Sequence, residues 1–376
     1  MTDKTSNPWM HGPTIEPLPL RRGIAFDEFI ERVFAGSGYN ARRVGEACRL
    51  FKRMLAEDVT VCLTLAGAMT PIGMSGPIIT MIEHGFIDWI ISTGANLYHD
   101  LHRTFDYPMV QGDFRVDDES LLENGVARIY DVFIEDDETL METDRVILRA
   151  VRNQNLPDTF STADLHHAIG REILAAAPHP EKSLLAAAAK HKIPIYCSSP
   201  GDSSIGMNLV VPYIFDRPID VSTSLDVLET AAIVKHSAKS GALEVGGGSP
   251  KNFYMQTQPT LWQILQQNQG GHDYMIQLTT DAPHWGGLSG ATPGEAKSWG
   301  KLKTSETNHV VVYSCASITF PIICQYALET CAAKPIKALY DRKDTFTREL
   351  IESSRQNASL RRNYAAVGSD TPKHED

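Results

Sequence analysis

The chain has 376 residues, a formal net charge of −11, and ordinary shares of apolar (42%) and charged (22%) side chains. This length allows a large buried core, in one large α/β domain or in two smaller ones. The negative charge and the lack of a long basic run argue against nucleic acid and anionic membranes as main partners. The acidity suits a cationic substrate, but it equally suits a protein whose charge only maintains solubility.

Cysteine usage and the N-terminal sequence indicate the compartment. The six cysteines include no CxxC pair and lie mostly in apolar segments, so we expect free core thiols, a reducing compartment and no zinc cluster. The first residues are polar and proline-rich, without the apolar stretch of a signal peptide. No apolar run reaches membrane-spanning length. We therefore expect a cytoplasmic protein.

The first segments in chain order are an extended arm and a helical region. Residues 1–22 contain four prolines and no periodicity, which predicts an extended arm. From Phe26 to Ala56, apolar residues recur at helical spacing. The break at Gly36–Gly38 divides this region into two predicted helices.

Six short β-rich runs then alternate with helical stretches. The runs span residues 59–68, 88–96, 193–206, 242–252, 274–283 and 309–317. Strands that alternate with helices predict a mostly parallel, doubly wound sheet with helices on both faces, as in Rossmann-related α/β folds.

The domain organisation follows from the same pattern. We expect a single α/β domain over residues 23–350 and a polar C-terminal tail over residues 351–376. The region of about 111–180 carries acidic clusters and no clear βα unit, so it is predicted to be an insertion packed on the sheet.

Four of the predicted strands end in small or polar residues. In open parallel sheets, ligands bind beyond the carboxyl ends of the strands. Small residues there let the backbone approach a pyrophosphate, although a glycine run is also typical of a tight turn. GxGxxG and GxxxxGK[ST] are both absent, so neither common phosphate-binding fingerprint is present. The strand-end residues are Thr70, Gly73 and Ser75; Ser92, Thr93 and Gly94; Ser199, Gly201 and Asp202; and Gly246, Gly247 and Gly248.

The histidine pairs His99/His102 and His166/His167 lie at helical spacing. Because there is no HExxH and no evident third ligand, surface or core packing is a simpler interpretation than a metal site. A Ser/His/Asp triad is not indicated either, because no GxSxG elbow is present.

The stretch GEAKSWGKL (Gly294–Leu302) contains the candidate for chemistry. Lys301 is either a solvated surface charge, as most lysines are, or the nucleophile of a Schiff base. A nucleophilic lysine needs a lowered pKa, which desolvation beside Trp299 and the charge of Lys297 would supply. The residues alone leave both interpretations open.

The same stretch resembles the active-site signature of the deoxyhypusine synthase family. Four further segments match that family in order and spacing, and the resemblance covers about residues 25–335: LENGVARIYDVFI (Leu122–Ile134), IPIYCSSPGDSSIG (Ile193–Gly206), EVGGGSPKN (Glu244–Asn252) and VVYSCASITFPII (Val311–Ile323). The resemblance implies a transferase in which NAD oxidises spermidine. A lysine imine carries the aminobutyl group to an acceptor lysine on a translation factor, and the NADH reduces the product.

The resemblance also implies an assembly and a set of roles. It implies a homotetramer with active sites at dimer interfaces, and an N-terminal arm, here residues 1–22, that blocks a neighbour's site. Lys301 matches the imine-forming lysine, Glu295 a carboxylate that holds the polyamine, and Trp299 the wall of its channel. Positions that match the lining of the NAD site are Thr93, Asp202, Gly246, Gly247, Gly248, Thr280, Ser289 and Ala316, and Gly94 adjoins the first of them.

The polyamine pocket departs from the family. Asn252 stands where the family has a histidine, and Met207 and Leu288 stand at the positions of two polyamine-binding carboxylates. Losing one carboxylate partner of a desolvated ammonium costs about 2–5 kcal/mol. We therefore expect spermidine to bind poorly and a shorter or differently charged amine to bind better, unless Asp281 compensates.

Two functions from different classes remain. The first is a deoxyhypusine synthase-like, NAD-dependent aminobutyl transferase acting on polyamines through Lys301, with a protein lysine or a small diamine such as putrescine as acceptor, the latter as in homospermidine formation. The second is a non-catalytic nucleotide- or amine-binding homologue on the same scaffold. It is favoured by His99, Trp285 and Cys315, which stand at acidic positions of the family's cofactor site. Retention of Lys301 together with Trp299 favours the enzyme.

Overall fold

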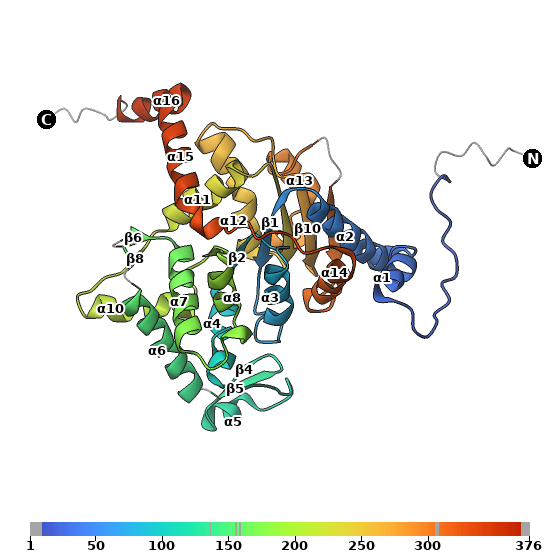
Figure 1. Cartoon of the computed structure of the whole chain (residues 1–376), viewed down its shortest axis with the longest axis horizontal. Helices are drawn as coiled ribbons and strands as arrows, with labels where there is room; N and C mark the ends of the chain where they lie inside the picture. Colours follow the sequence, from blue (N-terminus) through green and yellow to red (C-terminus); the bar gives the residue numbers. More distant parts are fainter. Residues whose placement is uncertain (1–9, 136, 155, 158, 305–307, 370–376) are drawn as a thin grey trace, which may run out of the picture.

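A six-stranded parallel sheet forms the centre of the structure (Figure 1). The computed structural model describes residues 10–135, 137–154, 156–157, 159–304 and 308–369. Each strand coincides with one of the six predicted runs, and only β9 begins before its run, so the predicted parallel α/β sheet is confirmed. The strands are β1 (Val59–Leu65), β2 (Trp89–Ser92), β7 (Ile195–Cys197), β9 (Lys239–Val245), β10 (Tyr274–Thr279) and β11 (His309–Tyr313).

The strand order is β11-β10-β9-β1-β2-β7, and all neighbouring pairs are parallel. The chain runs outward from β1 to β2 and β7, then returns to β9 on the other side of β1 and continues to β10 and β11. The connections of β1 and β9 therefore leave in opposite directions. Ligands in open α/β sheets bind in the crevice beyond the carboxyl ends of two such strands.

Helices cover both faces of the sheet because the central strands are apolar on both sides. All seven residues of β1 are buried. Leu63 and Leu65 belong to one apolar layer, whereas Cys62 belongs to the other, as expected from the alternation of side chains along a strand. The first layer packs on α2 (Tyr39–Ala56), α3 (Ser75–Glu83) and α14 (Ala316–Thr330), and the second on α11 (Thr223–Lys235) and α12 (Gly248–Pro259).

The N-terminal region confirms the predicted pair of helices. The first helix, α1 (Phe26–Phe29), continues as a π-helical turn, η2 (Ile30–Phe34), and α2 begins at Tyr39 after the predicted break. In the described part of the arm, residues 10–22 form neither helix nor strand. Figure 1 shows this segment running outside the body of the molecule, beside α1.

A small antiparallel sheet lies in the first part of the predicted insertion at about 111–180, and helices form most of the remainder. Its strand order is β3-β5-β4. The last helix of the segment, α7, packs on α8 and β7 and so joins the helices of the main sheet. The elements between β2 and β7 are α4 (Gly94–His99), η3 (His102–Phe105), β3 (Met109–Gln111), α5 (Asp118–Glu123), β4 (Val126–Ile129), β5 (Val132–Glu135), α6 (Asp137–Asn153), β6 (Thr159–Phe160), α7 (Thr162–Ala176), η4 (Pro180–Lys182) and α8 (Leu184–His191).

The C-terminal residues are helical as far as the described chain extends. The predicted polar tail begins inside α15 and continues through α16. Among the described residues, no helix is both long enough and apolar enough to cross a membrane. The remaining elements are α9 (Ser204–Asn208), α10 (Val210–Ile214), β8 (Asp220–Val221), η5 (Thr260–Ile264), η6 (Pro283–Trp285), η7 (Leu288–Gly290), α13 (Pro293–Ser298), η8 (Leu339–Asp341), α15 (Lys343–Gln356) and α16 (Ala358–Ser369).

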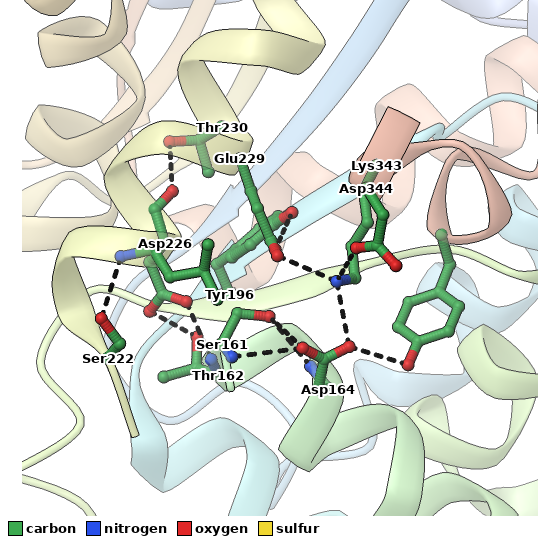
Figure 2. A network of polar contacts seen from close by, with 12 residues as sticks. Ser161, Thr162, Asp164, Tyr196, Ser222, Asp226, Glu229, Thr230, Lys343 and Asp344 are labelled. Atoms are coloured by element: carbon green, nitrogen blue, oxygen red, sulfur yellow. Dashed lines mark hydrogen bonds and ion pairs between the residues drawn. The ribbon is translucent and has the colours of Figure 1, made fainter. Parts of the chain in front are cut away.

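A buried ionic cluster attaches α15 to the helices beside β7 (Figure 2). Lys343 is only 3% exposed, and its Nζ lies 3.0 Å from Asp164, 2.9 Å from Glu229 and 2.8 Å from Asp344. Glu229 also accepts a hydrogen bond from the Tyr196 hydroxyl at 3.0 Å. Burial alone would lower the pKa of Lys343, but the charges of Glu229 and Asp164 raise it above its usual value.

Candidate functional site

The helix α13 begins at a defined cap that positions Glu295. The side chain of Thr292 accepts a hydrogen bond from the Glu295 backbone N–H at 3.1 Å. Pro293 occupies the first helical position, where its missing N–H is no loss. This cap fixes the start of a six-residue helix and places Glu295 in its first turn, where a negative charge is favoured.

The end of α13 positions Lys301. Gly300 has φ +65°, the left-handed conformation that glycine adopts without strain. Its N–H donates to the Lys297 carbonyl, and the Lys301 N–H donates to the Ala296 carbonyl, both at 3.0 Å. These two bonds form a Schellman motif. The motif stops the helix at Ser298 and turns the chain at Gly300, which places Lys301 just beyond the helix end.

A cavity of about 270 Å³ lies beside this turn. It brings together the predicted catalytic lysine and four of the predicted substrate-binding residues, from α12, η7, α13 and the turn that follows. Sequence reasoning therefore selected half of its lining. The lining residues are Lys251, Asn252, Met255, Gln256, Leu288, Ala291, Glu295, Ala296, Trp299 and Lys301.

Lys301 is half-buried in this cavity, and burial lowers its pKa. The charge of Glu295 acts in the opposite direction and favours the protonated amine. The Nζ of Lys301 lies 5.8 Å from the centroid of the Trp299 ring, at the outer limit of a cation–π attraction. The surroundings therefore favour a more reactive lysine than a solvated surface residue.

Sequence reasoning missed Lys251, the second lysine of the cavity. Lys251 is 4% exposed, and its Nζ donates to Gln277 Oε1 at 2.9 Å and to the Ala291 carbonyl at 2.7 Å. The cation predicted beside Lys301 was Lys297, but the cavity lining contains Lys251. The available signal was the position of Lys251 in the EVGGGSPKN segment, directly before Asn252.

The glycine run after β9 makes a close approach to the loop after β10. Gly246 and Gly248 have φ +80° and +56°. A Cβ on Gly247 would lie 2.5 Å from the Cα of Ser289, and the Gly248 N–H donates to the Ser289 hydroxyl at 2.8 Å. Gln277 joins the two loops by donating to the carbonyls of Gly246 at 3.0 Å and Ser289 at 2.8 Å. Four predicted cofactor residues thus lie together beyond the carboxyl ends of β9 and β10.

The other predicted cofactor residues lie at the same edge of the sheet. Thr93 caps α4 after β2, and its hydroxyl donates to the Gly67 carbonyl at 2.7 Å. Gly94 packs closely on Ser203, where a Cβ would be 2.3 Å from the serine side chain. The three that remain follow β7, β10 and β11, and they are Asp202, Thr280 and Ala316.

Met207, a predicted substrate-binding residue, does not line the cavity, and Trp285 and His99 stand at positions where the family has acids. Met207 is 65% exposed on α9, and Trp285 is 71% exposed on η6. His99 Nδ1 lies 2.9 Å from His102 Nε2, and His102 Nδ1 lies 2.8 Å from the Thr143 hydroxyl. Burial lowers the pKa of His99 to about 4 and that of His102 to about 3. His99 is therefore neutral near pH 7 and does not replace the charge of an acid.

The second histidine pair packs in the core, which confirms that interpretation. His166 is buried, with Nδ1 2.7 Å from the Ile195 carbonyl, and His167 stacks on Tyr340 with ring centroids 3.8 Å apart. In the described ranges, no three His, Cys, Asp or Glu residues are grouped as metal ligands would be. The expectation of core thiols is wrong for Cys315, which is exposed at the start of α14.

The fold and the cavity define a doubly wound α/β protein with a half-buried lysine in a cavity beside the helix that follows the glycine loop. The model of the family described as deoxyhypusine synthase matches residues 29–327, and the chain belongs to this family. A deoxyhypusine synthase-like protein of Nostoc punctiforme is 41% identical over 349 residues, which are 90% of this chain and 89% of the relative. A deoxyhypusine synthase-like protein of Thermosynechococcus vestitus is 39% identical over 368 residues, with 93% and 90% covered. The resemblance is confirmed.

A solved structure supports the fold independently of sequence identity. The structure of a proposed deoxyhypusine synthase from Entamoeba histolytica superposes with a TM-score of 0.54, covering 84% of this chain and 96% of that chain. The two sequences are only 17% identical, so this likeness concerns the fold alone.

Proposed function

We propose that the chain is an NAD-dependent aminobutyl transferase that holds its donor as an imine on Lys301. The observation that carries the proposal is the cavity that groups Lys301, Trp299 and Glu295 beside the glycine loop of β9. Membership of the deoxyhypusine synthase family supports the reaction class. Desolvation of Lys301 supports its role as nucleophile, because only the neutral amine attacks carbon.

The remaining lining residues determine which amine fits. Glu295 is the carboxylate available to one ammonium group, while Leu288 and Met255 line the cavity with apolar surface. A second ammonium at Leu288 would be desolvated without a partner. We therefore propose that the cavity takes a short diamine such as putrescine, with one ammonium group on Glu295, as the acceptor of a homospermidine synthase-like reaction.

The residues around the glycine loop fit a dinucleotide. The close contact of Gly247 with Ser289 leaves no space for a side chain, so the loop presents bare backbone, which suits the close approach of a pyrophosphate. Thr93 and Asp202 would complete the site from neighbouring strand ends. When bound, NAD would supply a hydride acceptor for the amine-bearing carbon of the donor. Lys301 would then form the C–N bond to that carbon, and the leaving amine would depart with a proton.

We further propose that the protein acts as a homotetramer with sites at dimer interfaces. The exposed apolar surface of α9 and α10 supports a subunit contact there, since monomers rarely expose such clusters. In such an assembly, Met207, which is exposed in one subunit, would line an active site at the interface with a second subunit. We propose that the N-terminal arm regulates the neighbouring site. The exposed side chains of this surface are Met207, Val210, Val211, Tyr213, Ile214 and Phe215.

The decisive experiment is borohydride trapping. The protein would be incubated with NAD and, separately, with spermidine, putrescine or agmatine, then reduced and analysed by intact and peptide mass spectrometry. We expect an aminoalkyl adduct on Lys301 that requires NAD and is lost in Lys301→Arg. Lack of an adduct with every amine, together with lack of bound NAD, would contradict the proposal.

That negative result would favour a non-catalytic binding homologue. The observation behind this alternative is the neutral His99, with Trp285 and Cys315 at the other acidic positions of the family's cofactor site. The thermal unfolding temperature of such a protein would still rise when an amine or a nucleotide binds. The protein would form no adduct at Lys301.

A further inference from the structure

Three polar side chains lie in a row across the sheet beneath α12. Thr64 of β1 and Gln277 of β10 are both in register with Glu244 of β9. In-register residues of parallel strands point to the same face, so the three side chains adjoin one another. All three are buried. A polar row of this kind is unusual in a parallel sheet, whose strands are normally apolar on both faces.

Glu244 is the unusual member of the row. It is fully buried, and neither of its carboxylate oxygens has a hydrogen-bond partner in the described part of the chain. Burial raises its pKa to about 8, although the charge of Lys251 opposes this shift. Buried carboxylates are normally bonded or paired, because an unpartnered charge is strongly disfavoured. Burial therefore favours the protonated, uncharged form of Glu244.

Lys251 connects Glu244 to the cavity. Its two hydrogen bonds go to neutral oxygens, those of Gln277 and Ala291, so neither bond neutralises its charge. Burial lowers its pKa most strongly, whereas the charge of Glu244 raises it and that of Lys301 lowers it. Both lysines line one cavity, and the repulsion between two cations is mutual, so a charged Lys251 also disfavours a charged Lys301.

The other titratable groups near Glu244 are uncharged at neutral pH. Cys62 of β1 and Tyr254 of α12 both have pKa values well above their usual range, chiefly because of burial and also because of the charge of Glu244. Lys251 is thus the charge that acts on Glu244. The charged groups that act on Lys251 are Glu244, Glu295, Asp281 and Lys301.

We infer that Lys251 and Glu244 form a charge-regulating pair for the lysine cavity. Lys251 places a second buried positive charge beside Lys301, and Glu244 cancels that charge when it ionises. Both are positioning residues that act through the charge of Lys301. The inference rests on the proposed role of Lys301 as the imine-forming lysine, and it identifies the residues that keep its amine neutral.

The direction of the effect follows from electrostatics. Two cations in one desolvated cavity repel each other, so a charged Lys251 favours the neutral, nucleophilic form of Lys301. While Glu244 is protonated, the charge of Lys251 is uncompensated and this effect is strongest. When Glu244 ionises, the pair becomes neutral and Lys301 regains its proton more easily. Asn252, which lines the same cavity from α12, has no titratable group to serve this purpose.

The test measures the protonation of Lys301 without turnover. The protein would be methylated with formaldehyde and cyanoborohydride over a range of pH, and the rate at each lysine read by peptide mass spectrometry. The rate at Lys301 follows its neutral fraction. Lys297, on α13, is the internal control, and its methylation rates should be the same in every variant.

Substitutions of the two partners should shift the Lys301 midpoint in opposite directions. Lys251→Met removes the neighbouring charge and should raise the midpoint by about one pH unit. Lys251→Arg keeps the charge and should leave the midpoint near that of the wild type. Glu244→Gln prevents the compensation and should lower the midpoint by about half a pH unit.

The outcomes separate this inference from the proposed function. Unchanged midpoints in both Lys251→Met and Glu244→Gln, or shifts in the same direction, would overturn the pair. The near-isosteric Glu244→Gln and Lys251→Arg decide the matter if Lys251→Met fails to fold. Opposite shifts, in a protein that traps no amine with NAD, would support the pair while contradicting the proposed reaction.

Discussion

The backbone N–H of Lys301 donates to the carbonyl oxygen of Ala296 at 3.0 Å, across the end of α13. This bond exists because Gly300, between them in the chain, adopts a left-handed conformation. The position of the proposed nucleophile therefore depends on a residue without a side chain. The bond also explains why the glycine of SWGK is essential to the geometry of the site.

Gly300→Ala should weaken both the turn and the site. A left-handed alanine is strained by roughly 1–2 kcal/mol, and its Cβ would lie 3.3 Å from Trp262 Nε1. We expect a loss of stability of this size in urea unfolding, and a larger proportional loss of borohydride adduct at Lys301. Gly294→Ala is the matched control, since its Cβ would only touch the Thr292 hydroxyl at 3.8 Å. Equal adduct yields in the two variants would contradict this account.

Glu295→Gln should make Lys301 more reactive and amines less tightly bound. The charge of Glu295 raises the pKa of Lys301, so its removal should lower that pKa and speed methylation of Lys301 by formaldehyde and cyanoborohydride at pH 8. The same change removes the proposed ammonium partner, so the diamine concentration for half-maximal trapping should rise about three- to tenfold. Asp281→Asn is the comparison. If it weakens trapping and Glu295→Gln does not, Asp281 is the ammonium partner.

The main elements were predictable because their signals are local. A strand such as Val59–Leu65 is a continuous apolar run that ends in small residues, and this pattern is typical of a strand buried on both faces. The helix that carries Glu295 is bounded by a capping threonine and a terminal glycine, both visible in the sequence. The sheet and the strand-end residues follow from such local patterns. In the cavity lining, Lys301 and Trp299 were candidates from the residues alone, whereas the family resemblance implied Glu295, Asn252 and Leu288.

The missed features depend on contacts between distant segments. The three-residue strand Met109–Gln111 forms only by pairing with Val132–Glu135, and its length is too short for a reliable alternation pattern. The role of Lys251 depends on Gln277 and Ala291, which lie on the next strand and the loop beyond it. No spacing within EVGGGSPKN indicates that its lysine is buried.

The ionic cluster of Figure 2 should dominate the attachment of α15. Lys343→Met leaves the buried Glu229 and the adjacent Asp164 without the cation between them, and breaking such a buried pair costs about 3–5 kcal/mol. We expect a loss of this size in urea unfolding. Lys190→Met, on the exposed last turn of α8, is the control and should be nearly neutral. Similar stability of both variants would mean that the cluster contributes little.

Stability should pass through a maximum near pH 6–7, because two sets of buried groups act in opposite directions. The buried carboxyls of Glu244, Asp226 and Asp100 have pKa values raised by burial to about 8, 7 and 6. As pH falls from 8, the native protein binds protons on these groups that the unfolded chain does not bind, so the free energy of unfolding increases.

Below about pH 6.5, the usual histidine pKa, the direction reverses. Burial lowers the pKa of five histidines, to about 4 for His99, His166 and His167 and to about 3 for His102 and His272. Below pH 6.5 the unfolded chain therefore takes up more protons on these five groups than the native state gains on the three carboxyls. Each such proton removes about 1.4 kcal/mol of stability per pH unit until the native pKa is reached. The urea concentration at the unfolding midpoint, measured between pH 5 and pH 8, would show the maximum. In Asp226→Asn this midpoint should fall less steeply between pH 7 and pH 8 than in the wild type. A midpoint that rises continuously to pH 8 would contradict the raised carboxyl pKa values.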